Sequence, residues 1–186
     1  ALMGENGAGK STLMKILYGI YIPDEGGELI LDDKPFKPGR PIDAIRRGLT
    51  MVPQEISPAA NLTIADNFYL GREITKGKFF LNQKAMNEQA SAILKELGVP
   101  MDVTEKMSDV SVAKAQLVAI ATAVSNDAKV IIMDEPTTAL TENEVDQLYR
   151  IIETVKARGI AIIFISHKLD EVFRVSDEIT VIRDGQ

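Results

Sequence analysis

The sequence contains no cysteine, only one histidine and no long run of apolar residues. The lack of cysteine excludes disulfides, thiolate catalysis and thiolate metal sites. No apolar run approaches the roughly 20 residues of a membrane-spanning helix, and no signal peptide is visible. The net charge of −6 gives no support for nucleic-acid binding, which favours a basic surface. We therefore expect no nucleic-acid partner and no direct membrane insertion, so that any membrane role passes through a partner protein.

The length of 186 residues suits one domain with room for a subdomain. A hydrophobic content of 45% and a charged content of 26% are ordinary for a globular chain. The apolar residues Ala1–Met3 suit the end of a buried strand that lacks its flanking strands upstream. We therefore expect a core that is truncated at its N-terminus.

A glycine-rich segment directly after Met3 matches the phosphate-binding loop: Gly, four residues, Gly-Lys, then Ser or Thr. Its glycines permit a tight path whose amides form an anion nest. Lys10 can reach the β and γ phosphates, and the Ser11 hydroxyl can bind Mg²⁺. Apolar residues at helical spacing follow, which predicts a nucleoside triphosphate site rather than a chance glycine turn. The residues of this loop are Gly4, Glu5, Asn6, Gly7, Ala8, Gly9, Lys10, Ser11 and Thr12.

Alternating buried strands and helices predict an α/β fold of the P-loop NTPase type, with a mostly parallel sheet flanked by helices. Pro35, Pro38 and Pro41 argue against regular structure before Ile42. A capping box at Thr141 opens a later helix. Strands are expected at residues 28–32, 49–52, 129–133, 160–165 and 178–183, and helices at 42–47, 83–97, 113–124, 142–158 and 168–175.

The stretch from Glu55 to about Asp109 carries helical patterns and no convincing strand. We interpret it as part of an inserted helical subdomain. The predicted division is therefore a P-loop core of residues 1–54 and 125–186, with a helical subdomain of residues 55–124.

Polar side chains follow several of the expected strands, at the edge where α/β proteins bind ligands. Asp134 suits Mg²⁺ together with Ser11, and Glu135 suits a group that polarises the attacking water. Gln54 can approach Mg²⁺ or water without adding charge, and His167 follows a predicted strand, so we expect it within reach of a γ-phosphate. Taken singly, Asp134 and Glu135 could form an acidic turn, Gln54 could be a surface residue, and His167 could have a structural role. Their convergence with the loop predicts a catalytic site formed by Gln54, Glu135 and His167.

The order of these motifs resembles an ABC-type ATPase over nearly the whole chain. It comprises the phosphate loop, Gln54, Val110–Lys114, Met133–Pro136 and Ile165–His167. The chain is similar in particular to nucleotide-binding domains of bacterial carbohydrate importers of the ribose, galactose and xylose kind, as the first of two such domains in one polypeptide. The stretches that carry this likeness are Met3–Leu17, Glu135–Val145 and Ser166–Gly185.

The resemblance implies a role for each matching residue. Gln54 would sense the γ-phosphate and Mg²⁺ and couple the site to the helical insertion. Glu135 would orient the water, and His167 would contact the γ-phosphate. Ser111 would begin a signature motif that acts on ATP held by a facing domain, although it also suits a plain helix N-cap. The signature residues are Ser111, Val112, Ala113 and Lys114.

Three departures from the family pattern stand out. The usual signature reads Leu-Ser-Gly-Gly-Gln, and only Ser111 matches it here. Thr141 stands where the family carries Asp. The aromatic residue that stacks on adenine lies upstream in the family, so we expect weakened adenine binding in this sequence.

The resemblance therefore implies an ATPase, with ATP and Mg²⁺, that powers carbohydrate import through an ABC transporter. Its partners would be a second ATP-binding domain and transmembrane permease subunits, and its location the cytoplasmic face of the bacterial inner membrane, as a peripheral subunit. One alternative is a soluble ABC ATPase of translation or DNA repair, against which the acidic charge and the lack of sustained heptads argue. Another is a nucleotide-binding module poor in hydrolysis, against which Glu135 argues.

Overall fold

The chain forms two compact units in the computed structural model. The structure describes residues 1–5, 7–77, 80–183 and 185. Unit 1 comprises Ala1–Gln54, Asn126–Pro136 and Gly159–Gln186, and unit 2 comprises Glu55–Ser125 and Thr137–Arg158. The predicted boundary after Gln54 coincides with a boundary between the units, whereas residues 137–158 group with unit 2. The division into a core and a helical subdomain stays a prediction.

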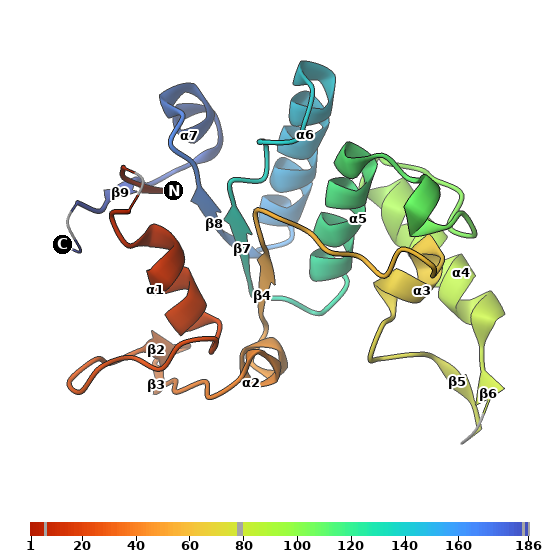
Figure 1. The fold of residues 1–186 in the computed structure, drawn as a ribbon, viewed down its shortest axis with the longest axis horizontal. Helices are drawn as coiled ribbons and strands as arrows, with labels where there is room; N and C mark the ends of the chain where they lie inside the picture. Colours follow the sequence, from red (N-terminus) through yellow and green to blue (C-terminus); the bar gives the residue numbers. More distant parts are fainter. Residues whose placement is uncertain (6, 78–79, 184, 186) are drawn as a thin grey trace. The chain divides into compact units, whose positions relative to one another are not determined.

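A five-stranded parallel sheet in the order β4-β7-β8-β1-β9 forms the centre of unit 1 (Figure 1). Its three longest strands are apolar and largely buried, as expected of parallel strands covered on both faces. The predicted parallel sheet is thus confirmed. Its strands are β1 (Leu2–Met3), β4 (Leu49–Val52), β7 (Val130–Asp134), β8 (Ala161–Ile165) and β9 (Thr180–Val181).

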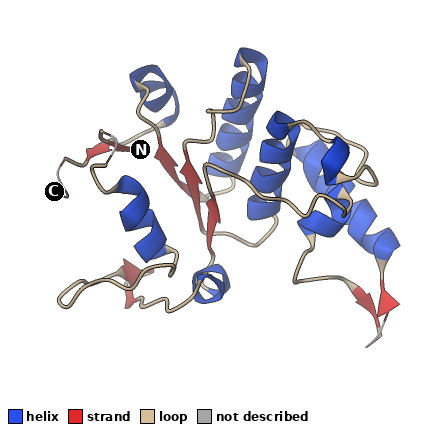
Figure 2. Cartoon of the chain, in the orientation of Figure 1, coloured by secondary structure: helices blue, strands red, loops and turns tan. Residues whose placement is uncertain are grey.

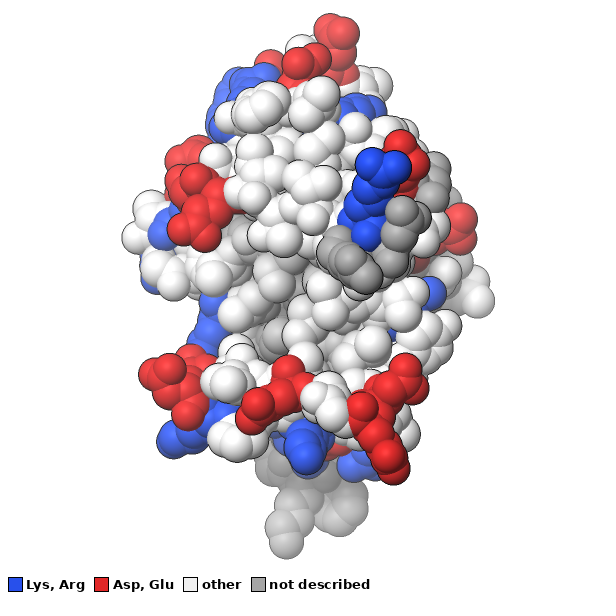
Figure 3. Space-filling view, turned by 90° about the vertical axis from the view of Figure 1, so that its left-hand side faces the viewer, with Lys and Arg blue, Asp and Glu red and all other residues white. Residues whose placement is uncertain are grey.

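The helix α1 follows the glycine-rich loop and packs its inner side on this sheet. Met14, only 2% exposed, lies in a core cluster with apolar side chains from β1, β4, β7 and β8. Leu13 of α1 is 37% exposed. On the face drawn in Figure 3, charged side chains gather mainly around the margin. The helices of unit 1 are α1 (Lys10–Leu17), α2 (Pro41–Arg46) and α7 (Leu169–Val175).

Unit 2 is built from helices with a short hairpin (Figure 2). The helix α5 contacts α3, α4 and α6, and its buried side is almost wholly apolar. Side chains at helical spacing on α4 and α6 complete this core, as the sequence predicts. The elements are α3 (Ile64–Phe68), β5 (Thr75–Lys76), β6 (Phe80–Leu81), α4 (Gln83–Glu96), a 3-10 turn (Met107–Asp109), α5 (Val112–Val124) and α6 (Glu142–Ala157).

Two short hairpins differ from the prediction. In unit 1, β2 (Ile30–Leu31) lies within the strand predicted at 28–32, whereas its partner β3 (Lys34–Pro35) was not predicted, because the prolines argued against regular structure there. Proline is tolerated because β3 is an edge strand, which leaves its missing amide unneeded. In unit 2, β5 and β6 pair within the stretch predicted to lack strands. Strands of two residues are too short to show a period in sequence.

The predicted helices are confirmed with small shifts at their ends, as is usual for helix boundaries. The last strand is shorter than predicted, since β9 covers only Thr180–Val181 of the expected 178–183. None of the helices in the described part of the chain combines the length and the apolar composition needed to cross a membrane.

Candidate active site

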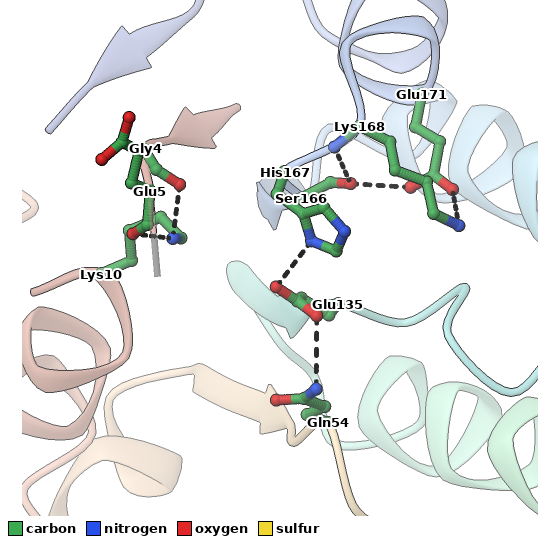
Figure 4. Close-up of polar contacts among 9 residues, drawn as sticks. All are labelled: Gly4, Glu5, Lys10, Gln54, Glu135, Ser166, His167, Lys168 and Glu171. Atoms are coloured by element: carbon green, nitrogen blue, oxygen red, sulfur yellow. Dashed lines mark hydrogen bonds and ion pairs between the residues drawn. The ribbon is translucent and has the colours of Figure 1, made fainter. Parts of the chain in front are cut away.

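The parallel register of unit 1 brings three predicted residues to the same edge of the sheet. Val52 of β4 pairs with Met133 of β7, so the carboxyl ends of these strands lie level. Asp134 pairs with Ile165 of β8 in the same way. The side chains that follow these ends, Gln54, Glu135 and His167, therefore converge (Figure 4).

Glu135 stands between the other two and contacts both. Gln54 Nε2 donates to Glu135 Oε2 at 3.2 Å, and His167 Nδ1 lies 3.0 Å from Glu135 Oε1. The Glu135 side chain is 14% exposed, whereas that of His167 is 51% exposed. The two nitrogens therefore hold the shielded carboxylate in one orientation, as a group that receives a proton from a positioned water requires.

The backbone of Glu135 is unusual. Its φ is 43°, in the left-handed region that residues with a Cβ avoid at a cost on the order of 1 kcal/mol. Its amide donates to the Ile165 carbonyl at 3.0 Å, which ties it to β8. The turn directs the Glu135 side chain towards Gln54 and His167 (Figure 4).

Asp134 is the buried end of β7, with 6% of its surface exposed. Burial raises the pKa of Asp134, and the negative charge of Glu135 adds to this shift. A hydrogen bond with Ser11 and the charge of Lys10 act in the opposite direction. Asp134 therefore links the glycine-rich loop to the group around Glu135, so that both belong to one site.

Lys10 is 6% exposed, and its side chain is held by the backbone at the start of the glycine-rich loop. Its Nζ donates to the carbonyls of Gly4 and Glu5 at 2.7 and 3.0 Å (Figure 4). Gly9, with φ 102°, precedes α1 and has the left-handed backbone that glycine adopts freely. The predicted loop residue Asn6 lies outside the described residues.

Gly4 is required for a different reason, which is space. A Cβ at Gly4 would lie 2.2 Å from the Ile182 carbonyl oxygen. The Ile182 amide in turn donates to the Met3 carbonyl at 2.8 Å, so this neighbour is fixed. The loop backbone can therefore take its tight path only with glycine at this position.

The predicted signature residues belong to unit 2. Ser111 is the N-cap of α5, and its Oγ accepts a hydrogen bond from the Lys114 amide at 3.3 Å. Val112 is 64% exposed, and the first turn contains no acidic side chain. Ala113 is buried, unlike its neighbours. The first turn of α5 therefore leaves amides and a lysine side chain for an anion.

The donor set around Asp134 fits Mg²⁺ bound together with a triphosphate. Ser11 and Asp134 are hydrogen-bonded, so a hydroxyl and a carboxylate oxygen already lie together. Among the residues that the structure describes, no group of three or more His, Asp or Glu side chains could hold a metal ion alone. Mg²⁺ usually binds one or two protein oxygens, and phosphate and water complete its coordination shell.

Sequence reasoning missed Glu171 of α7. Ser166 Oγ donates to Glu171 Oε2 at 2.8 Å, and Lys168 Nζ lies 2.9 Å from Glu171 Oε1 (Figure 4). The spacing of Lys168 and Glu171 on a helix was the available signal, because residues three apart share a face. The partner at Ser166 lies before the helix and gives no such signal.

The parallel sheet, the loop between β1 and α1, and the polar groups at the strand ends define a P-loop nucleotide-binding domain. Two solved structures agree with this fold over the whole chain at 27% identity, and the chain covers 76% of each. They are the ADP conformation (TM-score 0.84) and a nucleotide-free form (TM-score 0.81) of ATP-binding cassettes from ABC transporters. A family model described as ABC transporter matches residues 1–138, and the chain belongs to this family.

Curated relatives resemble the chain closely but are much longer. A galactose/methyl galactoside import ATP-binding protein of Yersinia pestis is 48% identical over all of this chain and 36% of its own length. The protein of the same description from Mannheimia succiniciproducens is 47% identical, again over 100% of the chain and 36% of its length. The chain thus spans about a third of the length of these relatives.

Proposed function

We propose that this chain is an ATP-hydrolysing domain that powers carbohydrate import through an ABC transporter. The observation that carries the proposal is the meeting of Gln54, Glu135 and His167 at the carboxyl edge of the sheet, next to Asp134 at the end of β7. Family membership and relatives named as galactose/methyl galactoside import ATP-binding proteins support the cargo class.

The loop binds the triphosphate of ATP. Its amides and the α1 N-terminus attract negative charge, and Lys10 moves from the carbonyls of Gly4 and Glu5 to the β and γ phosphates. The ammonium exchanges two neutral acceptors for anionic ones, which make stronger hydrogen bonds. The residues that contact nucleotide are Gly4, Glu5, Asn6, Gly7, Ala8, Gly9, Lys10, Ser11 and Thr12.

Glu135 accepts a proton from the attacking water, and His167 and Gln54 hold its two oxygens in place. His167 then turns its other ring nitrogen to the γ-phosphate. Ser11, Asp134 and the Gln54 amide oxygen would hold Mg²⁺, which when bound neutralises phosphate charge. These roles follow from chemistry and position, and substitution of each residue tests them.

Two partners complete the proposed machine. A second ATP-binding domain faces this one, and Ser111, Val112, Ala113 and Lys114 act on the ATP which that domain holds. Permease subunits carry the sugar across the membrane, so this chain acts as a peripheral subunit at the cytoplasmic face of the bacterial inner membrane. The length of the relatives leaves room for a second domain in the same polypeptide.

The test uses the full-length protein with its permease in liposomes. We expect ATP-dependent uptake of radiolabelled ribose, galactose or xylose, and loss of both uptake and hydrolysis in the Glu135→Gln variant. Glu142→Gln, an exposed carboxylate on α6, is the matched control. ATP hydrolysis without uptake of any sugar would contradict the transport assignment, and absence of hydrolysis in the parent would contradict the enzymatic one.

A further inference from the structure

The two residues on either side of His167 are tied to one carboxylate, that of Glu171. Ser166 Oγ donates to Glu171 Oε2 at 2.8 Å, and Lys168 Nζ donates to Glu171 Oε1 at 2.9 Å (Figure 4). The Lys168 amide also donates to Ser166 Oγ at 3.1 Å, which closes the turn. Ser166, Lys168 and Glu171 thus form a clamp with His167 at its apex.

This clamp is buried at its base and open at its apex. Glu171 is 8% exposed and Ser166 2% exposed, whereas half of the His167 side chain is exposed. A buried carboxylate is costly unless it is paired and hydrogen-bonded, and here Lys168 and Ser166 supply both. The base is therefore rigid, and the apical imidazole is presented to Glu135 at 3.0 Å.

A simple helix cap would not need this arrangement. The helix α6 is capped locally, since Thr141 N and Oγ1 donate to Glu144 Oε2 three residues later. In α7 the carboxylate at the equivalent position, Glu171, reaches back past the N-cap residue Lys168 to Ser166. That bond spans His167, so it fixes the residue that faces Glu135.

We propose that Glu171 is a positioning residue, which acts through Ser166 and Lys168 to hold His167 in place for ATP hydrolysis. This inference rests on the proposed function. It requires that loss of the clamp lower the rate of the chemical step and leave nucleotide binding intact, because the hydrogen bonds from Ser166 and Lys168 to Glu171 join residues 166–171 to one another. Loss of position by about 1 Å can cost up to about a hundredfold in rate.

The first experiment measures kcat and KM for ATP in the full-length protein. Glu171→Gln is expected to lower kcat about tenfold with KM unchanged within about twofold, and Lys168→Gln about threefold. Asp170→Asn removes the same charge from the exposed neighbouring position and is expected to match the parent within about twofold. Lys168 is half exposed, so Lys168→Gln keeps the fold intact should Glu171→Gln be poorly folded.

The second experiment is a double-mutant cycle with His167→Ala, measured by single-turnover hydrolysis of radiolabelled ATP. Because Glu171 acts through His167, Glu171→Gln is expected to lower the rate in the parent and to have no further effect in the His167→Ala protein. Lys168→Gln should show the same non-additivity. An equal loss in both backgrounds marks a merely structural role and overturns the proposal, as does an unchanged rate in the parent background.

The cycle also separates this inference from the proposed function. If the parent hydrolyses no ATP, or if the His167→Ala variant hydrolyses it as fast as the parent, the proposed role of the site itself is wrong. The inference then falls with it. An active parent that depends on His167 but is indifferent to Glu171→Gln and Lys168→Gln overturns the positioning role alone.

Discussion

The polar contacts around Glu135 in unit 1 and those of the helix caps in unit 2 span very different distances along the sequence. In unit 1, Gln54 contacts Glu135 and Glu135 contacts His167, from three different strand ends. In unit 2, Asp66 contacts Thr63 and Glu144 contacts Thr141, each within one helical turn. The first kind of contact exists only after the sheet has formed, whereas the second helps its own helix to begin.

This difference separates chemistry from stability. Helix caps contribute roughly 1 kcal/mol each and do not depend on a ligand. Asp134 and Glu135 of unit 1 lie close together. Burial of Asp134 and the charge of Glu135 raise the pKa of Asp134, so the ionised form of this carboxyl is disfavoured. Such an arrangement is typical of functional sites. Substitutions in unit 1 should therefore change hydrolysis, and substitutions of caps in unit 2 should change folding.

The largest expected effect comes from Glu135→Gln in the full-length protein. Without the carboxylate no group at this position accepts the proton of water, so kcat for ATP should fall about a hundredfold or more. The amide retains the shape of the side chain, and ATP affinity should stay within about threefold. Steady-state hydrolysis and equilibrium binding of a fluorescent ATP analogue measure the two quantities. A kcat near that of the parent would show that Glu135 of unit 1 does not contribute to hydrolysis, and the proposed difference between the units would be wrong.

Lys10→Met should weaken nucleotide binding most. On ATP binding, the buried ammonium of Lys10 exchanges two neutral carbonyls for phosphate oxygens. A hydrogen bond to a charged group contributes about 1.5–3 kcal/mol, which is roughly 10- to 100-fold in the Kd for ATP. Calorimetric titration with ATP in Mg²⁺ measures this. Lys15→Met, on the same helix outside the loop, is the control. Unchanged affinity in Lys10→Met would show that the loop does not hold the phosphates through this residue.

Ser111→Ala and Thr141→Ala sharpen the comparison within unit 2. Both residues are helix N-caps, so each substitution should lower the free energy of unfolding by about 1 kcal/mol. Only Ser111→Ala should also lower hydrolysis, by about tenfold, because we assign Ser111 a contact with the facing nucleotide. Urea denaturation and ATPase rates measure the pair. Equal rates for the two variants would leave Ser111 as a cap alone.

The smallest effect is a pH-dependent one at Asp66, the capping acid of α3. Burial acts to raise the pKa of Asp66, but hydrogen bonds from Thr63 and Gln83 outweigh it and lower the pKa below 3.8. A lowered pKa in the folded state stabilises the protein above pH 3.8, and this contribution is lost as the pH falls through the folded value. Asp66→Asn should therefore cost about 1 kcal/mol or less at pH 7.

The pH series supplies the control for that variant. The difference in unfolding free energy between Asp66→Asn and the parent should shrink towards zero as the pH falls below 3.8, because the parent then carries a neutral acid too. Urea denaturation at several pH values measures it. A difference that is constant with pH would mean that the charge of Asp66 does not contribute.

Much of unit 1 could be predicted because buried parallel strands are recognisable in sequence as continuous apolar runs. Strands β7 and β8 are such runs. The order of strands then brings residues such as Gln54 and His167 to one edge without further information. The Pro35 strand was missed because its pairing depends on the turn at Asp32 and Asp33, both in left-handed conformations. Glu171 was missed because its bond to Ser166 depends on the exact entry of α7.

The close approach of Gly4 to Ile182 has a consequence for engineering. The nearest atoms of Ile182 to a Cβ at Gly4 are those of its carbonyl, so exchange of the Ile182 side chain should leave this clearance intact. An insertion or deletion next to β9 would instead displace that carbonyl and reshape the phosphate-binding loop from a segment far away in the sequence. Linkers fused after β9 should therefore keep the register of this edge strand, since nucleotide affinity depends on its main chain.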